Sequence, residues 1–246
     1  MSILPTINIK NSRNKLRNIA LPVLLISVLG ACNDSNNSTP TVMPEPEPME
    51  YSYQVTVTNL TYAQPLSPIT AVLHGDEKMW SVGESASSAL EKLAESGDNS
   101  DFIAQTSIIT SMADDGVLMP GLSSSITVST TEANATHLSV TTMLVNTNDA
   151  FSGLTGLELS NFEVDQKMSW NLNVYDAGTE ANSETAGTIP GPADGGAGFD
   201  IVRDDVDVVT FHPGVVSQDD GLTNSVLTQA HRFDNPAIKL TITRLK

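Results

Sequence analysis

Residues 138–145, LSVTTMLV, and residues 168–175, MSWNLNVY, are two apolar runs interrupted by polar side chains, and each continues directly into an acidic turn. The turns are Asn146-Thr147-Asn148-Asp149 and Asp176-Ala177-Gly178-Thr179-Glu180. Alternation with a period of two is typical of β-strands that have one buried face. If both strands enter one sandwich in the same sense, their trailing loops lie at the same end. We therefore expect the carboxylates of Asp149, Asp176 and Glu180 to converge.

Three carboxylates at close range repel one another strongly unless a cation lies between them. Calcium is the natural candidate, because it takes about six to eight oxygen ligands and tolerates the geometry of loops. The alternative is that both segments are solvated turns, since Asn, Asp and Gly are ordinary turn residues. The spacing of the residues alone supports the two interpretations about equally.

The rest of the exported sequence indicates an all-β domain with short strands separated by turns. Alternating or apolar segments predict further strands at residues 53–58, 69–73, 126–130, 206–211 and 238–242. Helical spacing is clear at residues 88–96, where Ser88 and Glu91 form a capping box and Gly97 is a stop signal. We expect this helix, with a short one near Phe102, to cover an open end of the sandwich. Residues 188–198, TIPGPADGGAG, predict a long irregular loop.

Residues 1–31 have the pattern of a bacterial lipoprotein signal. A basic region is followed by an apolar run at residues 19–29, which is too short to span a bilayer as a stable helix. The box Leu29-Gly30-Ala31-Cys32 comes next, and Cys32 is the single cysteine of the chain. We expect cleavage before Cys32 and lipidation of its thiol, with acyl chains that attach the protein to the membrane. A plain secretory peptide is the alternative interpretation. The basic residues are Lys10, Arg13, Lys15 and Arg17.

The lipidated end is followed by a tether, residues 32–50, which is rich in Asn, Ser, Thr, Pro and Glu and is expected to be extended and unpacked. Asn33 follows the cysteine where Asp could stand, which in enterobacterial-type sorting favours the outer membrane. We therefore expect a protein of the cell envelope that is lipid-anchored, with its periplasmic or surface face undecided. Residues 51–246 are expected to form one folded domain.

Charge and cysteine content limit what this domain can do. Removal of the signal leaves 8 Lys and Arg residues against 29 Asp and Glu residues, a net charge near −21. Such a surface repels nucleic-acid phosphates and anionic lipid headgroups, so no nucleic-acid partner is expected. With Cys32 lipidated, the domain has no thiol for a disulfide.

Two segments of the chain resemble the signature loops of spondin domains, the family module found in F-spondin and mindin. They are residues 143–153, MLVNTNDAFSG, and residues 175–180, YDAGTE. The resemblance covers roughly residues 53–245. Further matches in the same order are LSP at 66–68, EKLAESG at 91–97, LMPG at 118–121 and PAIKLTI at 236–242.

This resemblance implies an antiparallel β-sandwich similar to C2 domains, with a structural calcium ion held by acidic loop residues and with no catalysis. The residues that match the ligand positions are Asp149, Asp176 and Glu180. Two departures bear on the site. Ala150 stands directly after the loop aspartate and displaces the aromatic residue, Phe151, by one position. Glu180 replaces the aspartate of the animal proteins, so a longer side chain has to reach the same ion.

The sequence thus favours a lipid-anchored, calcium-binding adhesion or interaction module, whose partner is an extracellular protein or polysaccharide. The alternative is a glycan-acting enzyme that uses acidic residues at the same loop end. A pocket with two carboxyl groups facing each other would favour catalysis. A tight acidic cluster would favour an ion. The four histidines lack the paired spacing of zinc sites, and no other catalytic motif is present.

Overall fold

The computed structural model describes residues 47–246, so the predicted signal, the lipidation site at Cys32 and most of the tether lie outside the described residues. The helices are α1 (Ser88–Ser96), α2 (Ser100–Ile103) and the short 3-10 turns η1 (Gln218–Asp220) and η2 (Gln229–His231). The strands are β1 (Tyr51–Asn59), β2 (Thr70–His74), β3 (Ile108–Ala113), β4 (Ser123–Thr130), β5 (His137–Met143), β6 (Ala150–Glu158), β7 (Lys167–Leu172), β8 (Val174–Asp176), β9 (Thr210–Phe211) and β10 (Ile238–Arg244).

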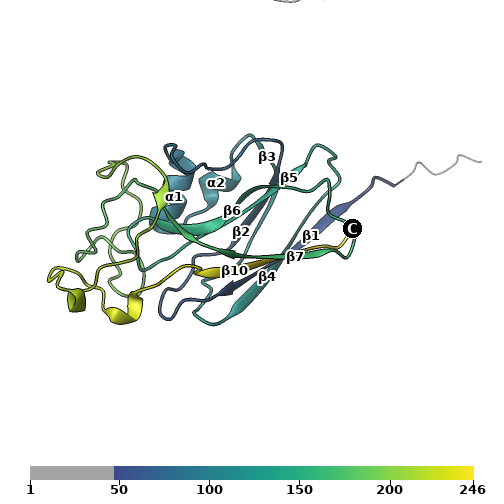
Figure 1. Ribbon diagram of the computed structural model, residues 1–246. Helices are drawn as coiled ribbons and strands as arrows, with labels where there is room; N and C mark the ends of the chain where they lie inside the picture. Colours follow the sequence, from purple (N-terminus) through teal and green to yellow (C-terminus); the bar gives the residue numbers. More distant parts are fainter. Residues whose placement is uncertain (1–46) are drawn as a thin grey trace, which may run out of the picture. The chain divides into compact units, whose positions relative to one another are not determined.

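The strands form two stacked sheets, in which every pairing is antiparallel (Figure 1). The four-stranded sheet has the order β4-β1-β10-β7, and the six-stranded sheet has the order β3-β2-β5-β6-β8-β9. Strands β1 and β10 come from opposite ends of the domain sequence and pair in the middle of the first sheet, with Val55 opposite Ile242. The predicted all-β antiparallel sandwich is confirmed.

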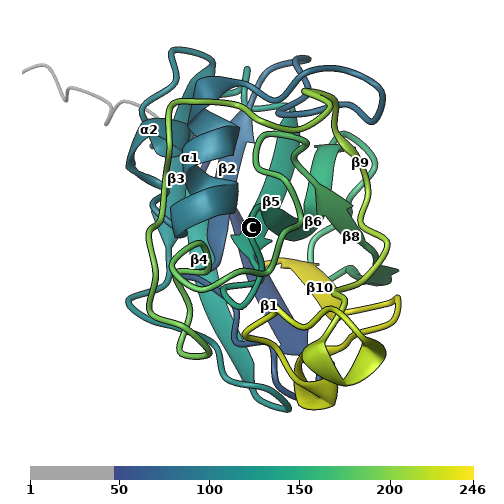
Figure 2. The ribbon, with the colours of Figure 1, turned by 90° about the vertical axis from the view of Figure 1, so that its left-hand side faces the viewer.

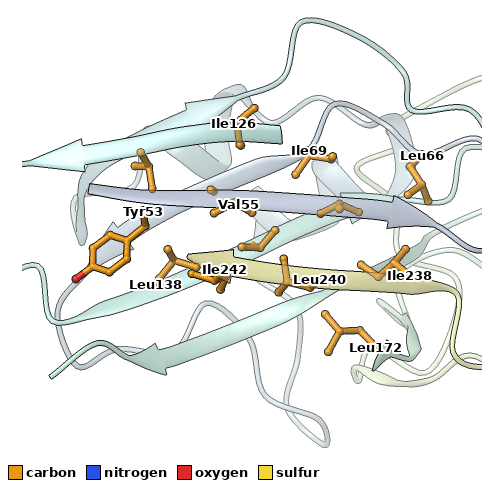
Figure 3. Close-up of a cluster of buried hydrophobic side chains, with 14 of the residues drawn as sticks. Tyr53, Val55, Leu66, Ile69, Ile126, Leu138, Leu172, Ile238, Leu240 and Ile242 are labelled. Carbon is orange, nitrogen blue, oxygen red and sulfur yellow. The ribbon is translucent and has the colours of Figure 1, made fainter. Parts of the chain in front are cut away.

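The core lies between the two sheets and is built from the alternating residues of their strands (Figure 3). On β1, Tyr53, Val55 and Val57 are buried, whereas Gln54 is exposed. A strand in a half-buried sheet shows this pattern because successive side chains point to opposite faces. Strands β4 and β10 follow the same rule.

The middle of the six-stranded sheet, formed by β2, β5 and the first half of β6, is buried on both faces. On β2, Ala71 and Leu73 belong to the core between the sheets, whereas Val72 points the other way and packs with Leu90 of α1 and Phe102 of α2. Figure 2 shows the two helices lying over this sheet. The prediction that the helices cover an open end of the sandwich was therefore wrong. They form a third layer on the outer sheet face, whose apolar side chains would otherwise face water.

Helix α1 has the predicted bounds, and its ends are capped on both sides. The N-cap is Ser87, one residue before the predicted box, and its hydroxyl accepts a 3.2 Å hydrogen bond from the N–H of Leu90. At the other end Gly97 adopts a left-handed φ of 71° and donates its N–H to the carbonyl of Leu93. Glycine is favoured there because it adopts positive φ without steric cost. The predicted short helix near Phe102 is present as α2.

Two strand predictions need correction. The run at residues 168–175 is two strands, because the chain leaves the four-stranded sheet after Leu172, passes Asn173 and enters the six-stranded sheet as β8. The run at residues 206–211 contributes just the two residues of β9. Its earlier part turns away from strand geometry at Asp207, where φ is 55°.

Residues 177–237 are mostly irregular and include the predicted loop at 188–198, which has no helix or strand. A small apolar cluster of Ile189, Val215 and Leu227 lies beneath these loops. None of the helices in the part of the chain that the structure describes has the length and apolar character needed to cross a membrane.

Candidate functional site

The two acidic turns lie side by side because strands β6 and β8 pair. In this pairing Ala150 lies opposite Asp176, so Asp149 and Asp176 come from adjacent strand ends. The N–H of Ala177 also donates a 3.3 Å hydrogen bond to the carbonyl of Asp149. The antiparallel register of two short strand segments therefore brings together the turns that the sequence singled out.

Asp149 is fully buried, and its two carboxylate oxygens have different surroundings. Oδ2 accepts hydrogen bonds from the N–H of Thr179 at 2.8 Å, the hydroxyl of Thr179 at 3.2 Å and the N–H of Glu180 at 3.2 Å. Oδ1 is buried without a hydrogen-bond partner among the described residues. Oδ2 of Asp149 therefore holds the turn at residues 176–180 in place, whereas Oδ1 is an unsatisfied acceptor.

Burial raises the pKa of Asp149 to about 7, and the neighbouring Asp176 carboxylate contributes to the increase. The hydrogen bonds from Thr179 and Glu180 oppose this change. A buried charge is costly unless an opposite charge or a proton compensates it. The site therefore favours either a proton or a cation at Asp149.

Asp176 is 3 % exposed and anchors the start of its own turn. Its Oδ1 accepts from the N–H of Gly178 at 2.8 Å, and its Oδ2 accepts from Nδ2 of Asn182 at 2.6 Å. Nε2 of His212 lies 4.0 Å from Oδ2, but burial lowers the pKa of His212 to about 4. The imidazole is therefore neutral near pH 7 and does not neutralise Asp176.

Glu180 is linked to the first turn through Asn148. The amide Nδ2 of Asn148 donates a 3.1 Å hydrogen bond to Oε1 of Glu180, whereas Oε2 is buried without a partner in the described part of the chain. Burial raises the pKa of Glu180 to about 7, and the charges of Glu95, Asp204 and Asp200 add to the increase. Glu180 thus lies in a second group of like charges.

The three carboxylates do not form a ready-made metal cage. Within residues 47–246, no group of three or more His, Cys, Asp or Glu side chains meets the geometry for holding a metal ion. The unbonded Oδ1 of Asp149 and Oε2 of Glu180 nevertheless fit a hard cation, which binds oxygen. Asp176 retains acceptor capacity, because a carboxylate has about four lone-pair sites and two of these are used. The donor set therefore suits calcium, and the calcium site stays a prediction.

Sequence reasoning missed several residues of this region. Glu95 of α1 is 1 % exposed, and its Oε2 accepts a 2.9 Å hydrogen bond from the N–H of Asp200. Glu184 is 2 % exposed and has an unbonded Oε2. The sequence did offer one signal: Glu91 and Glu95 are four residues apart in the predicted helix and therefore share a helix face. Asp200 and Glu184 carry no comparable local pattern, whereas Asn148 stands in the first acidic turn that the sequence singled out.

Comparison with protein families gives a match. No curated protein matches the chain. The family model described as Spondin_N matches residues 58–189, which is more than half of the chain and includes both acidic turns. The resemblance inferred from the loop residues is therefore confirmed, and this chain belongs to the spondin N-terminal domain family.

Proposed function

We propose that this spondin domain is a non-catalytic interaction module that binds one calcium ion through Asp149, Asp176 and Glu180. The family relationship supports an extracellular interaction or adhesion role. The ion would supply the positive charge that the buried Asp149 and Asp176 and the partly buried Glu180 lack. Its role is structural: Asp149 already links the two turns, and the ion would strengthen that link.

The observation that carries this proposal is the burial of the Asp149 carboxylate with one oxygen unbonded. Its side chain is fully buried, one oxygen is unbonded, and a second carboxylate stands on the adjacent strand end. An unpaired buried acceptor costs about 1–3 kcal/mol, and more for a charged group. Ordinary solvated turns would leave these oxygens in contact with water, so burial argues against that alternative.

The enzyme alternative has weaker support. General acid–base catalysis on a glycan needs two carboxyl groups that face a substrate. Asp149 and Asp176 are 0 % and 3 % exposed, so a sugar cannot reach them. A hollow of about 570 Å³ lies beside Gly75, Asp76 and Asn134. This hollow is at the His137 end of β5, whereas Asp149 follows the Met143 end.

The proposed location is the cell envelope, with lipidated Cys32 as the attachment to the membrane, favouring the outer membrane. The proposal rests on the Leu29-Gly30-Ala31-Cys32 box and on the Pro- and Glu-rich tether that follows it. The partner is an extracellular protein or a polysaccharide. Nucleic acid is an unsuitable partner, because the acidic domain would repel its phosphates.

Isothermal titration of the purified protein with calcium tests the ion site. We expect one ion per chain for the wild type and loss of most of the binding heat for Asp149→Asn, which removes the buried charge but keeps the shape. Asp219→Asn is the matched control, because Asp219 lies in an exposed turn and accepts from the N–H of Gln229. Equal binding by wild type and Asp149→Asn would refute the site.

Fractionation of cells that produce Cys32→Ala tests the anchor. The wild type should remain with the membranes through detergent-free washes, because several acyl chains together bind almost irreversibly. The variant should be released or should accumulate unprocessed. A variant that is processed and still stays with the membranes would disprove lipidation at Cys32.

A further inference from the structure

Residues 199–209 form an irregular strap that crosses from helix α1 to the turn at residues 176–180. The N–H of Asp200 donates to Oε2 of Glu95 on α1 at 2.9 Å. Further along, the N–H of Asp204 donates to the carbonyl of Thr179 at 3.1 Å, and the N–H of Asp207 donates to the carbonyl of Gly178 at 2.7 Å. The strap is thus fastened to two of the elements that surround the proposed ion site.

The strap and the turn are in direct backbone contact. A Cβ added to Gly178 would lie 2.4 Å from the carbonyl oxygen and 2.7 Å from the nitrogen of Val208, so no side chain fits between them. Ala181, which directly follows the turn, donates its N–H to Oδ1 of Asp204 at 2.8 Å. A shift of the turn would therefore have to move the strap as well.

Charge acts against this docking. The charges of Asp200 and Asp204 on the strap, together with Glu95, contribute to the raised pKa of Glu180 in the turn. Arg203 is the basic residue of the strap. Its guanidinium donates hydrogen bonds to Oε2 of Glu91 at 2.5 Å and to the carbonyl of Ala86 at 2.9 Å, and it forms an ion pair with Asp207. Two backbone hydrogen bonds and the bond from Ala181 to the Asp204 carboxylate thus hold the strap in place, whereas like charges oppose its docking.

We propose that occupancy of the cation site by calcium controls the docking of strap residues 199–209 on the turn at 176–180. This inference rests on the proposed function, because it requires an ion at Asp149, Asp176 and Glu180. An ion that holds the turn in place would also hold the carbonyls of Gly178 and Thr179, which accept the hydrogen bonds of the strap, and it would offset the charge of Glu180. Without the ion, the strap opens more often.

The strap carries a concentration of exposed apolar side chains. Phe199, Ile201, Val202 and Val206 are 40 %, 82 %, 66 % and 63 % exposed. Exposed apolar groups that gather on one segment are typical of contact surfaces. Docking of the strap therefore fixes how these four side chains are presented to solvent.

Amide hydrogen exchange with residue resolution tests the proposal, with calcium binding measured in parallel by titration calorimetry. The informative amides are those of Asp204 and Asp207, which donate to the turn. Their exchange should slow by about tenfold to a hundredfold when free calcium is a hundred times its dissociation constant. The amide of Leu240, in the centre of the four-stranded sheet, is the internal reference, because core amides exchange through global unfolding and so report how far calcium stabilises the whole fold.

Two variants at neighbouring positions test whether charge repulsion between the strap and Glu180 opposes docking. Asp204→Asn keeps an Oδ1 acceptor for Ala181 and removes one charge near Glu180, so its strap should exchange more slowly than wild type in chelator. Calcium should therefore slow amide exchange in the strap of Asp204→Asn by a smaller factor than in wild type. Asp205→Asn makes the same charge change on the next residue, which is exposed like Asp204 but has no hydrogen bond or ion pair with the turn among the described residues, and it should behave as wild type.

The outcomes separate the strap from the ion site. Calcium binding with unchanged exchange at Asp204 and Asp207 would overturn the strap inference and leave the proposed function intact. Absence of calcium binding would overturn both. Equal behaviour of Asp204→Asn and Asp205→Asn would show that charge near Glu180 does not govern docking, and would also overturn the inference.

Discussion

The two sheets and residues 177–237 hold their backbone in place by different means. In the four-stranded sheet, β1 and β10 bury one apolar face, and continuous ladders satisfy their backbone groups. Residues 177–237 contain one two-residue strand and two short 3-10 turns, and they bury polar side chains such as Glu184, His212 and Ser217. Apolar burial needs no partner, whereas a buried carboxylate needs a hydrogen bond, a proton or a cation. The stability of the loop region is therefore the part that should respond to ions and pH.

The largest expected effect is in the sheet. Leu240 is fully buried on β10, where it lies opposite Val57 and Trp170. Leu240→Ala should lower the free energy of unfolding by about 2–5 kcal/mol, because it removes apolar contacts and leaves a cavity. Denaturant unfolding in excess chelator measures this loss.

Thr241→Ala is the matched control on the same strand. Thr241 points to the other face, where its hydroxyl bonds the hydroxyl of Ser169 at 2.8 Å, and its loss should cost less than about 1 kcal/mol. If both variants retain the calcium response of the wild type, the sheets and the ion site are energetically separate. A calcium response lost in Leu240→Ala would contradict that separation.

The contrast also explains which features the sequence could predict. Strands β1 and β10 were recognisable because Val55, Val57, Leu240 and Ile242 alternate with polar residues. The helix at residues 88–96 had both capping signals. The alternation fails for β2, since Ala71, Val72 and Leu73 are all buried once α1 covers the outer face. A covering layer of this kind depends on contacts between distant residues and leaves no local pattern.

The candidate site also has features that the sequence could predict and features that it could not. Asp149, Asp176 and Glu180 follow recognisable strand ends and match family loops, so their positions could be predicted. The surroundings of Glu180 could not, because Glu95 and Asp204 approach it from segments far apart in the sequence. Likewise the split between β7 and β8 at Asn173 reflects a change of sheet, which an unbroken alternating run conceals.

The second prediction concerns calcium and stability. Calcium that binds only the folded protein should stabilise it by about 2.7 kcal/mol when the free ion is a hundred times its dissociation constant. Asp176→Asn should lose most of this gain, because one of the two adjacent buried charges is removed. Asp219→Asn, in the exposed η1 turn, should keep it. Thermal unfolding of the three proteins with calcium and with chelator measures the effect, and an unmoved wild-type curve would contradict it.

A third prediction compares two glycines outside the sheets. Gly178 and Gly83 have φ of 71° and 93°, so alanine is strained at both. An added Cβ meets the backbone of Val208 at Gly178, whereas it meets nothing within 4 Å at Gly83. Gly178→Ala should therefore cost about 1–3 kcal/mol more than Gly83→Ala, as expected for overpacking. Equal losses in chemical denaturation would mean that the strap can move away from the turn at little cost.

The smallest expected effect comes from Glu184, a buried carboxylate outside the proposed ligand set. Oε1 accepts from the N–H of Val216 at 2.9 Å, Oε2 has no partner in the described region, and burial raises the pKa of Glu184. A raised pKa means that the folded state holds the proton more tightly than the unfolded state, so this residue favours folding most at low pH. Its contribution declines as pH rises from the unfolded value of about 4.3 through the higher folded value.

Glu184→Gln cannot ionise, so its stability relative to wild type should improve as pH is raised from about 4 to about 8. The absolute stability of the variant is not informative, since the new amide also needs partners. The slope of the difference is informative, because titrations of distant groups cancel between the two proteins. Denaturant unfolding in chelator at several pH values gives this slope. A difference that stays constant with pH would show that Glu184 ionises equally easily in both states, and that this loop region tolerates a buried charge without an ion.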